Sequence, residues 1–193
     1  MEQEHKRRVR YKGTHPRNYK EKYKELNPEK YKDDVELGTL SIGNNKYKRS
    51  GDEMRRLVAE LYYKKGVEKW GSRYDIVLGG GFVSIRSPGY LAKGEVTYSM
   101  VQTLFPFDNQ LVLCTVKGSD LLNKFINTSN SNYFVFCKEG LEGNVRTDGT
   151  YYIVTDTYTS QYAPNNLREV EIYSESIFAR DIVADYIAAG GLS

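Results

Sequence analysis

The sequence predicts an α+β fold, a single domain in which helices flank a mixed sheet. Apolar runs with strand-like alternation and segments with helical apolar spacing are interspersed along the chain, and no internal repeat is present. The 193 residues suit one hydrophobic core, and 39% hydrophobic residues, with 13% of the chain aromatic, are enough to fill it. We therefore expect one globular domain over residues 35–193, preceded by an extension over residues 1–34.

The extension is basic and poor in apolar side chains. Residues 1–34 have almost no aliphatic residues and contain Pro16 and Pro28, so they cannot build a core of their own. Eleven Lys or Arg against seven Asp or Glu give this tract a local charge of +4. A short helix is predicted between Arg17 and Leu26, ending before Pro28. The charge fits a contact to nucleic acid, a ribosome or an anionic membrane surface, and it equally fits a solvated tail.

The predicted domain begins with a strand and a long helix. Residues 35–43 alternate like a strand, and Ser50 or Asp52 is a good N-cap type for the helix that follows. Apolar residues at helical spacing predict its buried face: Met54, Leu57, Val58, Leu61 and Tyr62. Three charged residues are expected on the opposite face: Arg55, Arg56 and Glu60. Gly66 or Gly71 marks the end of the helix.

A glycine run follows the next apolar segment. Tyr74 to Leu78 predicts a short buried strand, and Gly79, Gly80 and Gly81 come directly after it. Because glycine has no Cβ, a loop made of them could let the backbone approach a ligand closely. A simple turn between the strand and a helix is the alternative.

The rest of the domain continues to mix helices and strands. Thr97 is a candidate N-cap for a helix that reaches Leu104 and ends at Pro106. The remaining predicted elements are strands at 110–116, 133–137 and 150–155, a short helix at 120–126, and a final helix at 176–189.

Residues that support metal or nucleophilic chemistry are few. The two histidines, His5 and His15, lie in the extension, and neither belongs to a cluster with metal-ligand spacing. No Ser-His-Asp or Cys-His arrangement can be built from them within the core. Four scattered acids are expected in solvated turns: Asp108, Asp120, Asp148 and Asp156. Cys114 and Cys137 are expected to be buried thiols rather than a disulfide. Hydrolysis by this chain alone is therefore not expected.

Membrane and export signals are not evident in the sequence as given. No apolar stretch approaches the length that spans a bilayer, and Met1 is followed by polar residues without an apolar signal region. The sequence as given predicts a cytoplasmic protein with no membrane partner.

Residues 75–126 carry a specific pattern: DIVLGGG, IRSPG and GEVTYSMVQTLFPFDNQLVLCTVKGSDLLNKFI. This order resembles the C-terminal domain of the 5′-nucleotidase family, where a strand ends in Asn-Gly-Gly-Gly-Ile-Arg and Leu-Pro-Phe-x-Asn precedes the next strand. The likeness is weaker but in register over 35–66 and from Tyr151 onwards, so it covers roughly four fifths of the chain. It implies a nucleoside pocket in this domain and two metal ions in a neighbouring one.

The resemblance also implies roles for three ring and amide side chains. Phe107 and Asn109 match the family's Phe-x-Asn, in which the ring stacks on the purine and the amide hydrogen-bonds a base edge. Tyr158 falls where the family has a second stacking aromatic, which would complete a sandwich around the base. The family's Asn-Gly-Gly-Asp-Gly after this position is replaced by 159–164.

Further substrate-binding residues are implied around the glycines. Gly79 to Gly81 match the family glycines, and Arg86 stands for the family arginine that binds the substrate. Arg49 lies near a second family arginine. The chain departs from the pattern at Leu78, where the family has Asn, and at Phe82 to Ser84, which separate Arg86 from the glycines.

The function that the resemblance implies is a nucleotide- or nucleoside-binding domain of a 5′-nucleotidase-type phosphohydrolase, not catalytic by itself. No cofactor is expected in this chain, and divalent metals are expected only on a partner metallophosphoesterase domain or chain. Members of the family are commonly exported, so a fragment of a longer exported protein would be extracellular or periplasmic.

The alternative is a stand-alone ligand-binding or interaction module whose basic extension contacts nucleic acid or a protein partner. Over a short low-complexity span, the tract RYKGTHPRNYKEKYKELNPEKYKDD is similar to the basic N-terminal extension of some bacterial ribosomal-RNA methyltransferases. No methyltransferase cofactor loop follows it, because Gly79 to Gly81 lack the spacing of a dinucleotide fingerprint.

Overall fold

The chain divides into two compact units, Met1–Val35 and Glu36–Ser193. A computed structural model describes parts of the second unit, namely residues 36–40, 51–83, 85–86, 91, 94–162, 166–174 and 177–191. The helix expected over 17–26 and the candidate Arg49 lie outside the described residues.

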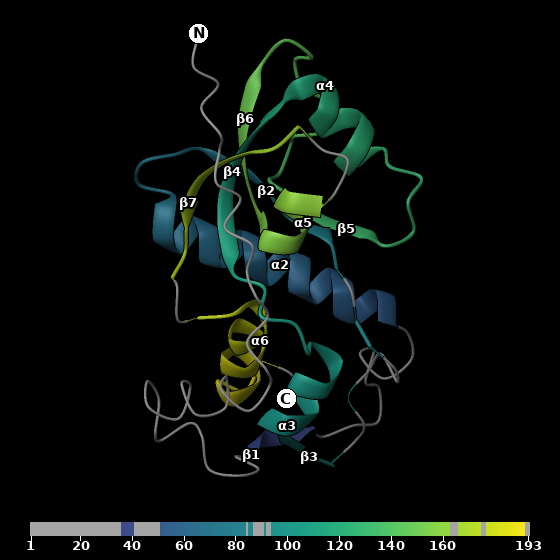
Figure 1. The fold of residues 1–193 in the computed structure, drawn as a ribbon, viewed down its shortest axis with the longest axis vertical. Coiled ribbons are helices and arrows are strands. Elements are labelled where there is room, and N and C mark those ends of the chain that lie inside the picture. Colours follow the sequence, from purple (N-terminus) through teal and green to yellow (C-terminus); the bar gives the residue numbers. More distant parts are fainter. Residues whose placement is uncertain are drawn as a thin grey trace, which may run out of the picture. The chain divides into compact units, whose positions relative to one another are not determined.

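A five-stranded mixed sheet of order β5-β2-β6-β4-β7 forms the centre of this unit (Figure 1). Its strands are β2 (Ile76–Phe82), β4 (Leu111–Lys117), β5 (Tyr133–Cys137), β6 (Thr150–Asp156) and β7 (Arg168–Ile172). β2 and β6 run parallel, whereas the other neighbouring pairs are antiparallel. A separate antiparallel pair joins β1 (Glu36–Leu40) and β3 (Gly94–Thr97). The predicted α+β fold with a mixed sheet is confirmed.

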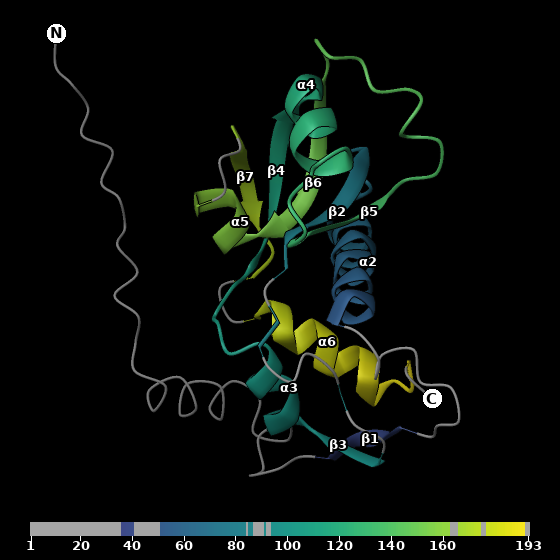
Figure 2. The same ribbon diagram turned by 90° about the vertical axis from the view of Figure 1, so that its right-hand side faces the viewer.

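Helices cover both faces of the sheet (Figure 2). The described helices are α2 (Gly51–Trp70), α3 (Tyr98–Leu104), α4 (Gly118–Asp120) with the π-helical turn η2 (Leu121–Ile126), α5 (Thr157–Tyr162) and α6 (Ala179–Ala188). Of these, α3 and α6 lie beside the sheet rather than on its faces (Figure 2). α2 packs on β2, β5 and β6. On the other face, Leu121 and Phe125 of η2 join Val112, Cys114 and Ile153 of the strands in one buried cluster. None of the helices that the structure describes has the length and apolar character to cross a membrane.

The predicted buried face of α2 is confirmed, because Met54, Leu57, Val58, Leu61 and Tyr62 are all buried. Gly66 does not end the helix. It lies inside α2, where a Cβ would collide with the Val154 side chain, so glycine allows the helix to approach the sheet closely. Arg55 was predicted to point away, but its Nε donates to the Val83 carbonyl oxygen at 3.1 Å and its guanidinium lies over the Phe134 ring.

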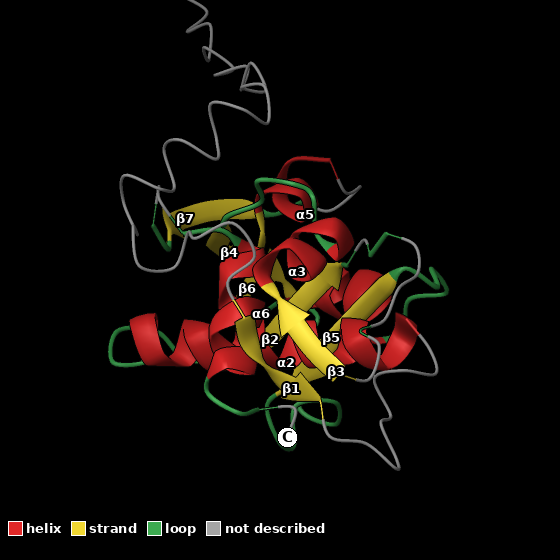
Figure 3. Ribbon diagram, turned by 90° about the horizontal axis from the view of Figure 1, so that it is seen from below, coloured by secondary structure: helices red, strands yellow, loops and turns green. Residues whose placement is uncertain are grey.

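A second group of elements lies beside the sheet. α6 contacts α3, β1 and α2, and α3 contacts β3 (Figure 3). The predicted helix after Thr97 is confirmed as α3. The final helix begins at Ala179, three residues later than the first predicted position, and the Phe178 backbone N–H at its start donates to Asp181 Oδ2 at 2.8 Å.

Three elements were not predicted: β3, α5 and β7. β7 is an edge strand with largely exposed side chains, and its alternation is limited to two apolar residues, Val170 and Ile172, which is too short a pattern to mark a strand. The expectation for the cysteines holds, because both thiols are free, with Cys114 buried and Cys137 partly buried. Burial raises the pKa of Cys114 to about 12.

Candidate functional site

A pocket lies where the ends of β2 and β6 meet the segment 105–110 and the start of α6. Its cavity volume is about 20 Å³, and it opens to solvent. Four apolar side chains line it, namely Val83, Phe105, Phe107 and Ala179. Four polar side chains also line it, namely Tyr62, Asn109, Asp156 and Arg180. An apolar wall with a few convergent polar groups is the usual composition of a small-molecule site.

Phe107 and Asn109, predicted to bind a ligand, both line this pocket. They belong to the segment between α3 and β4, which has no regular secondary structure. Phe107 is 42% exposed, so much of its ring is available for stacking. No described residue hydrogen-bonds the side-chain amide of Asn109, whereas the Asn109 carbonyl oxygen accepts from the Ala179 N–H at 2.7 Å. The pocket therefore presents an aromatic face and an amide side by side.

Arg86 contacts Phe107 although four residues separate it from the glycines. Its guanidinium carbon is 4.9 Å from the centre of the Phe107 ring, and its backbone N–H donates to the Leu104 carbonyl oxygen at 2.9 Å. Among the described residues, no carboxylate pairs with Arg86. The structure thus places Arg86 against Phe107, although Arg86 is not among the described residues that line the pocket.

Tyr158 is not among the described residues that line the pocket. Its ring, 43% exposed, packs instead against Phe82 at 5.5 Å and Tyr162 at 5.3 Å between ring centres. Asp156, two residues earlier, reaches the pocket from the end of β6, whereas Tyr158 lies in α5. The sandwich of Phe107 and Tyr158 around a base stays a prediction.

The three glycines do not form a loop, which corrects the expectation that they follow the strand. Gly79, Gly80 and Gly81 are buried inside β2, and none of them lines the pocket. A Cβ on Gly79 would lie 2.5 Å from the Tyr63 Cα in α2. Gly80 and Gly81 have φ of 121° and 142°, which side chains rarely adopt. Their shared role in this structure is close packing of the protein's own backbone.

Asp156 was predicted in a solvated turn, but it is buried and lines the pocket. It precedes α5, and its Oδ1 accepts from the Thr159 N–H at 2.8 Å, as a helix N-cap does. Its Oδ2 accepts from the Tyr62 hydroxyl at 3.2 Å. Burial raises the pKa of Asp156, outweighing the hydrogen bonds from Thr159 and Tyr62, which lower it. A prediction of α5 would have identified Asp156 as its cap.

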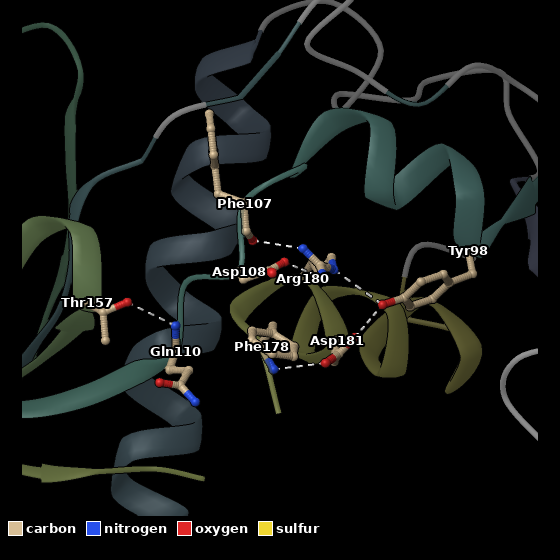
Figure 4. A network of polar contacts seen from close by, with 8 residues as sticks. All are labelled: Tyr98, Phe107, Asp108, Gln110, Thr157, Phe178, Arg180 and Asp181. Carbon is tan, nitrogen blue, oxygen red and sulfur yellow. Dashed lines mark hydrogen bonds and ion pairs between the residues drawn. The ribbon is translucent and has the colours of Figure 1, made fainter. Parts of the chain in front are cut away.

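Arg180, which the sequence analysis did not single out, is buried in a polar network at the pocket wall (Figure 4). Its Nη1 donates to the Phe107 carbonyl oxygen at 2.8 Å, and its Nη2 pairs with Asp108 Oδ1 at 2.8 Å. Asp108 is thus an ion-pair partner rather than a purely solvated turn residue. The Tyr98 hydroxyl donates to Asp181 Oδ1 at 2.5 Å in the same network. Because 72 residues separate Asp108 from Arg180, the pair has no local sequence signal.

The described residues contain no group of three or more His, Cys, Asp or Glu side chains placed to hold a metal ion. A two-metal phosphoesterase centre needs such a cluster to bind ions and activate water.

Comparison with known proteins adds a family. Residues 40–142, more than half of the chain, match the model of the 5′-nucleotidase C-terminal domain. Among solved structures, a 5′-nucleotidase precursor from Thermus thermophilus aligns with a TM-score of 0.46 and 17% identity, covering 69% of this chain and 32% of that one. The Haemophilus influenzae NAD nucleotidase aligns with a TM-score of 0.47 and 13% identity, covering 81% of this chain and 35% of that one.

Shorter stretches of the chain are similar in sequence to curated ribosomal RNA methyltransferases. The ribosomal RNA small subunit methyltransferase H 1 of Agathobacter rectalis is 41% identical over 80 residues, which is 42% of this chain and 22% of that protein. The methyltransferase of the same name from Lachnoclostridium phytofermentans is 72% identical over 32 residues, 17% of this chain and 9% of that protein. The chain thus spans about a fifth or less of these relatives.

The match over 40–142 covers the pocket segment and most of the sheet, and the chain belongs to the 5′-nucleotidase C-terminal domain family.

Proposed function

We propose that residues 36–193 form the nucleotide- or nucleoside-binding domain of a 5′-nucleotidase-type phosphohydrolase, not catalytic by itself. The observation that carries this proposal is that the exposed Phe107 ring and the Asn109 amide line one pocket, and that no described residue engages the amide. The ring offers a face on which a base can stack. The amide offers two donors and an acceptor, which suits the mixed edge of a base.

Arg86 would hold the ribose or phosphate of the same ligand. Its guanidinium lies against the Phe107 ring and has no carboxylate partner among the described residues. A guanidinium donates two parallel hydrogen bonds to a phosphate or to neighbouring hydroxyls. Because the guanidinium lies over one face of the Phe107 ring, a base would stack on the other face and have the cation close by.

Hydrolysis would fall to a metallophosphoesterase domain or chain that carries the divalent metals. The support for this division is the lack of a metal-ligand cluster among the described residues. The residues of the pocket would bind the nucleoside portion and hold its ester towards the catalytic partner.

Thermal unfolding with and without ligand tests the proposal. A ligand that binds only the folded state stabilises it, by about 2.7 kcal/mol at a concentration one hundred times the Kd. We expect adenosine or AMP at millimolar concentration to raise the Tm, and F107A to abolish the increase. F136A is the matched control, because Phe136 is a similarly exposed ring on β5 that packs against Tyr63 and does not line the pocket. The absence of any Tm increase in the wild type would contradict the proposal.

A second function, contact with RNA, is favoured by a separate observation. Residues 1–34 carry a charge of +4, from eleven Lys or Arg and seven Asp or Glu, and the curated relatives are by name enzymes of small-subunit ribosomal RNA. Binding through Lys and Arg releases counterions, so it weakens steeply as salt rises. We expect the full chain to bind ribosomal RNA at about 50 mM salt and to lose that binding when residues 1–34 are deleted. Binding that survives the deletion or ignores salt would exclude this role.

A further inference from the structure

We propose that Arg180 is a positioning residue that holds Phe107 and Asn109 where they line the pocket. The identity of the ligand in this proposal rests on the proposed function. The residue lies at the first turn of α6, far along the chain from the segment that it holds. It would act through the backbone of that segment rather than by reacting with the ligand.

The Arg180 guanidinium binds two consecutive residues of the segment 105–110, which has no regular secondary structure. Arg180 is 1% exposed, its Nη1 donates to the Phe107 carbonyl oxygen at 2.8 Å, and its Nη2 pairs with Asp108 Oδ1 at 2.8 Å. Its Nε donates to the Tyr98 hydroxyl at 3.4 Å. The planar, forked guanidinium makes these contacts in one fixed orientation, so the position of the Phe107 carbonyl is tied to α6.

The start of α6 holds the next residue as well. The Ala179 N–H donates to the Asn109 carbonyl oxygen at 2.7 Å. Asp181 fixes this helix start, since its Oδ2 accepts from the Phe178 N–H at 2.8 Å and its Oδ1 from the Tyr98 hydroxyl at 2.5 Å. Figure 4 shows Arg180 between the Phe107 carbonyl on one side and Tyr98 on the other.

The far end of the segment is anchored to α5. The Gln110 N–H donates to Thr157 Oγ1 at 3.2 Å, and the Thr157 N–H donates to the Gln110 carbonyl oxygen at 2.9 Å. The segment is thus tied at Phe107, Asn109 and Gln110 by elements distant in sequence. Among these interactions with the segment, those of Arg180 come from a side chain that also lines the pocket.

The contacts of Arg180 determine what its replacement should do. A lysine keeps the charge near Asp108, but a single ammonium on a flexible stem does not reproduce the fork that reaches Phe107, Asp108 and Tyr98 together. Asp108 is partly exposed, so water can solvate it when the guanidinium is absent. We therefore expect R180K to free the segment while the sheet stays folded.

Hydrogen exchange of the unliganded full chain tests the positioning directly and needs no ligand. In R180K, the amides of 105–110 should exchange about tenfold faster than in the wild type, while those of β4 and β6 keep their rates. R73K is the matched control, because Arg73 also binds a carboxylate, that of Glu171 at 2.8 Å, but on the exposed surface. Unchanged exchange at 105–110 in R180K would overturn the proposal, whatever the ligand proves to be.

Binding measurements then distinguish a positioning role of Arg180 from a role in the stability of the fold. R180K should weaken adenosine binding about tenfold or more by titration calorimetry, a loss of about 1.4 kcal/mol. In an F107A background, R180K should cause a much smaller further loss, because Arg180 acts on the ligand through the residue whose carbonyl oxygen it binds. Losses that simply add would contradict an action through Phe107. If R180K does not fold, D108N provides the same two measurements with a smaller expected effect in the same direction, since it removes the ion pair but leaves the Arg180 hydrogen bond to the Phe107 carbonyl oxygen.

Wild-type protein that binds neither adenosine nor AMP would refute the proposed function alone. The exchange result would still decide whether Arg180 holds the segment.

Discussion

At the scale of single residues, Asp156 combines two environments that act on its charge in opposite directions. The Thr159 N–H and the Tyr62 hydroxyl both donate to it, which favours the ionised form. Burial disfavours that form and is the larger effect, so the pKa of Asp156 is raised. The pocket wall therefore carries an acid whose charge depends on pH above the normal range of aspartate.

The raised pKa of Asp156 predicts a pH dependence of stability. Below about pH 4 the carboxyl is protonated in both the folded and the unfolded state, so the contribution to stability is fully present. As the pH rises from there towards the native pKa, only the unfolded state ionises, and the free energy of unfolding falls by up to about 1.4 kcal/mol per pH unit. D156N should lack this fall.

Urea unfolding between about pH 4 and pH 8 measures the effect. The stability of D156N relative to the wild type should increase with pH over that range. D148N is the control, because Asp148 is exposed and pairs only with Arg146 at the surface. A difference between D156N and the wild type that stays constant with pH would contradict the prediction.

At the scale of elements, the close approach of α2 to β2 depends on the absence of a side chain at Gly79. A Cβ there would lie 2.5 Å from the Tyr63 Cα, and backbone does not give way easily. We predict that G79A lowers the free energy of unfolding by about 1–3 kcal/mol, the usual cost of overpacking a core, or by more.

Chemical denaturation of G79A and G143A checks this prediction. Gly143 has open space where its Cβ would be, so G143A should be close to neutral. Equal stabilities of the two variants would show that α2 can shift away from the sheet at little cost.

Elements with a strong apolar pattern were predictable from the sequence, and elements without one were not. The buried face of α2 and the strands at 111–117 and 133–137 follow directly from hydrophobic periodicity. β7 has only two alternating apolar residues, Val170 and Ile172, and both are exposed, while α5 is a short helix rich in Thr and Tyr, so neither has a long apolar face. The glycines were predicted as a loop because their packing partners lie on other elements.

The candidate site was predictable only in part, for a similar reason. Phe107, Asn109 and Arg86 lie within about twenty residues of one another in a motif that a family pattern describes. Arg180 and Tyr62 enter the pocket from α6 and α2, and their partners Asp108 and Asp156 are 72 and 94 residues away. Such pairings depend on the fold, which composition and spacing do not specify.

At the scale of the whole molecule, Cys114 reports on the opening of the entire sheet. It lies in β4, which is hydrogen-bonded to β6 on one side and to β7 on the other. Its thiol is fully buried, and burial raises its pKa to about 12, so almost no thiolate forms in the folded state. We predict that a thiol reagent modifies Cys114 only after global unfolding.

Labelling of a C137S variant in increasing urea tests this prediction. The logarithm of the labelling rate at about pH 8 should rise linearly with urea, with the slope found for equilibrium unfolding by circular dichroism. The C114S variant is the control, in which the partly buried Cys137 of the edge strand should react faster. A labelling rate for Cys114 that does not change with urea would indicate local opening of β4.

The hold of α6 on the segment 105–110 also constrains when the pocket can form during synthesis. All five strands of the sheet precede α6 in the chain, so the sheet can begin to assemble before Arg180 emerges from the ribosome. Until then, the Phe107 carbonyl and Asp108 have no guanidinium to bind. A nascent chain arrested before α6 should therefore protect its sheet from protease and yet fail to retain nucleoside, so folding and ligand competence would be acquired at separate times.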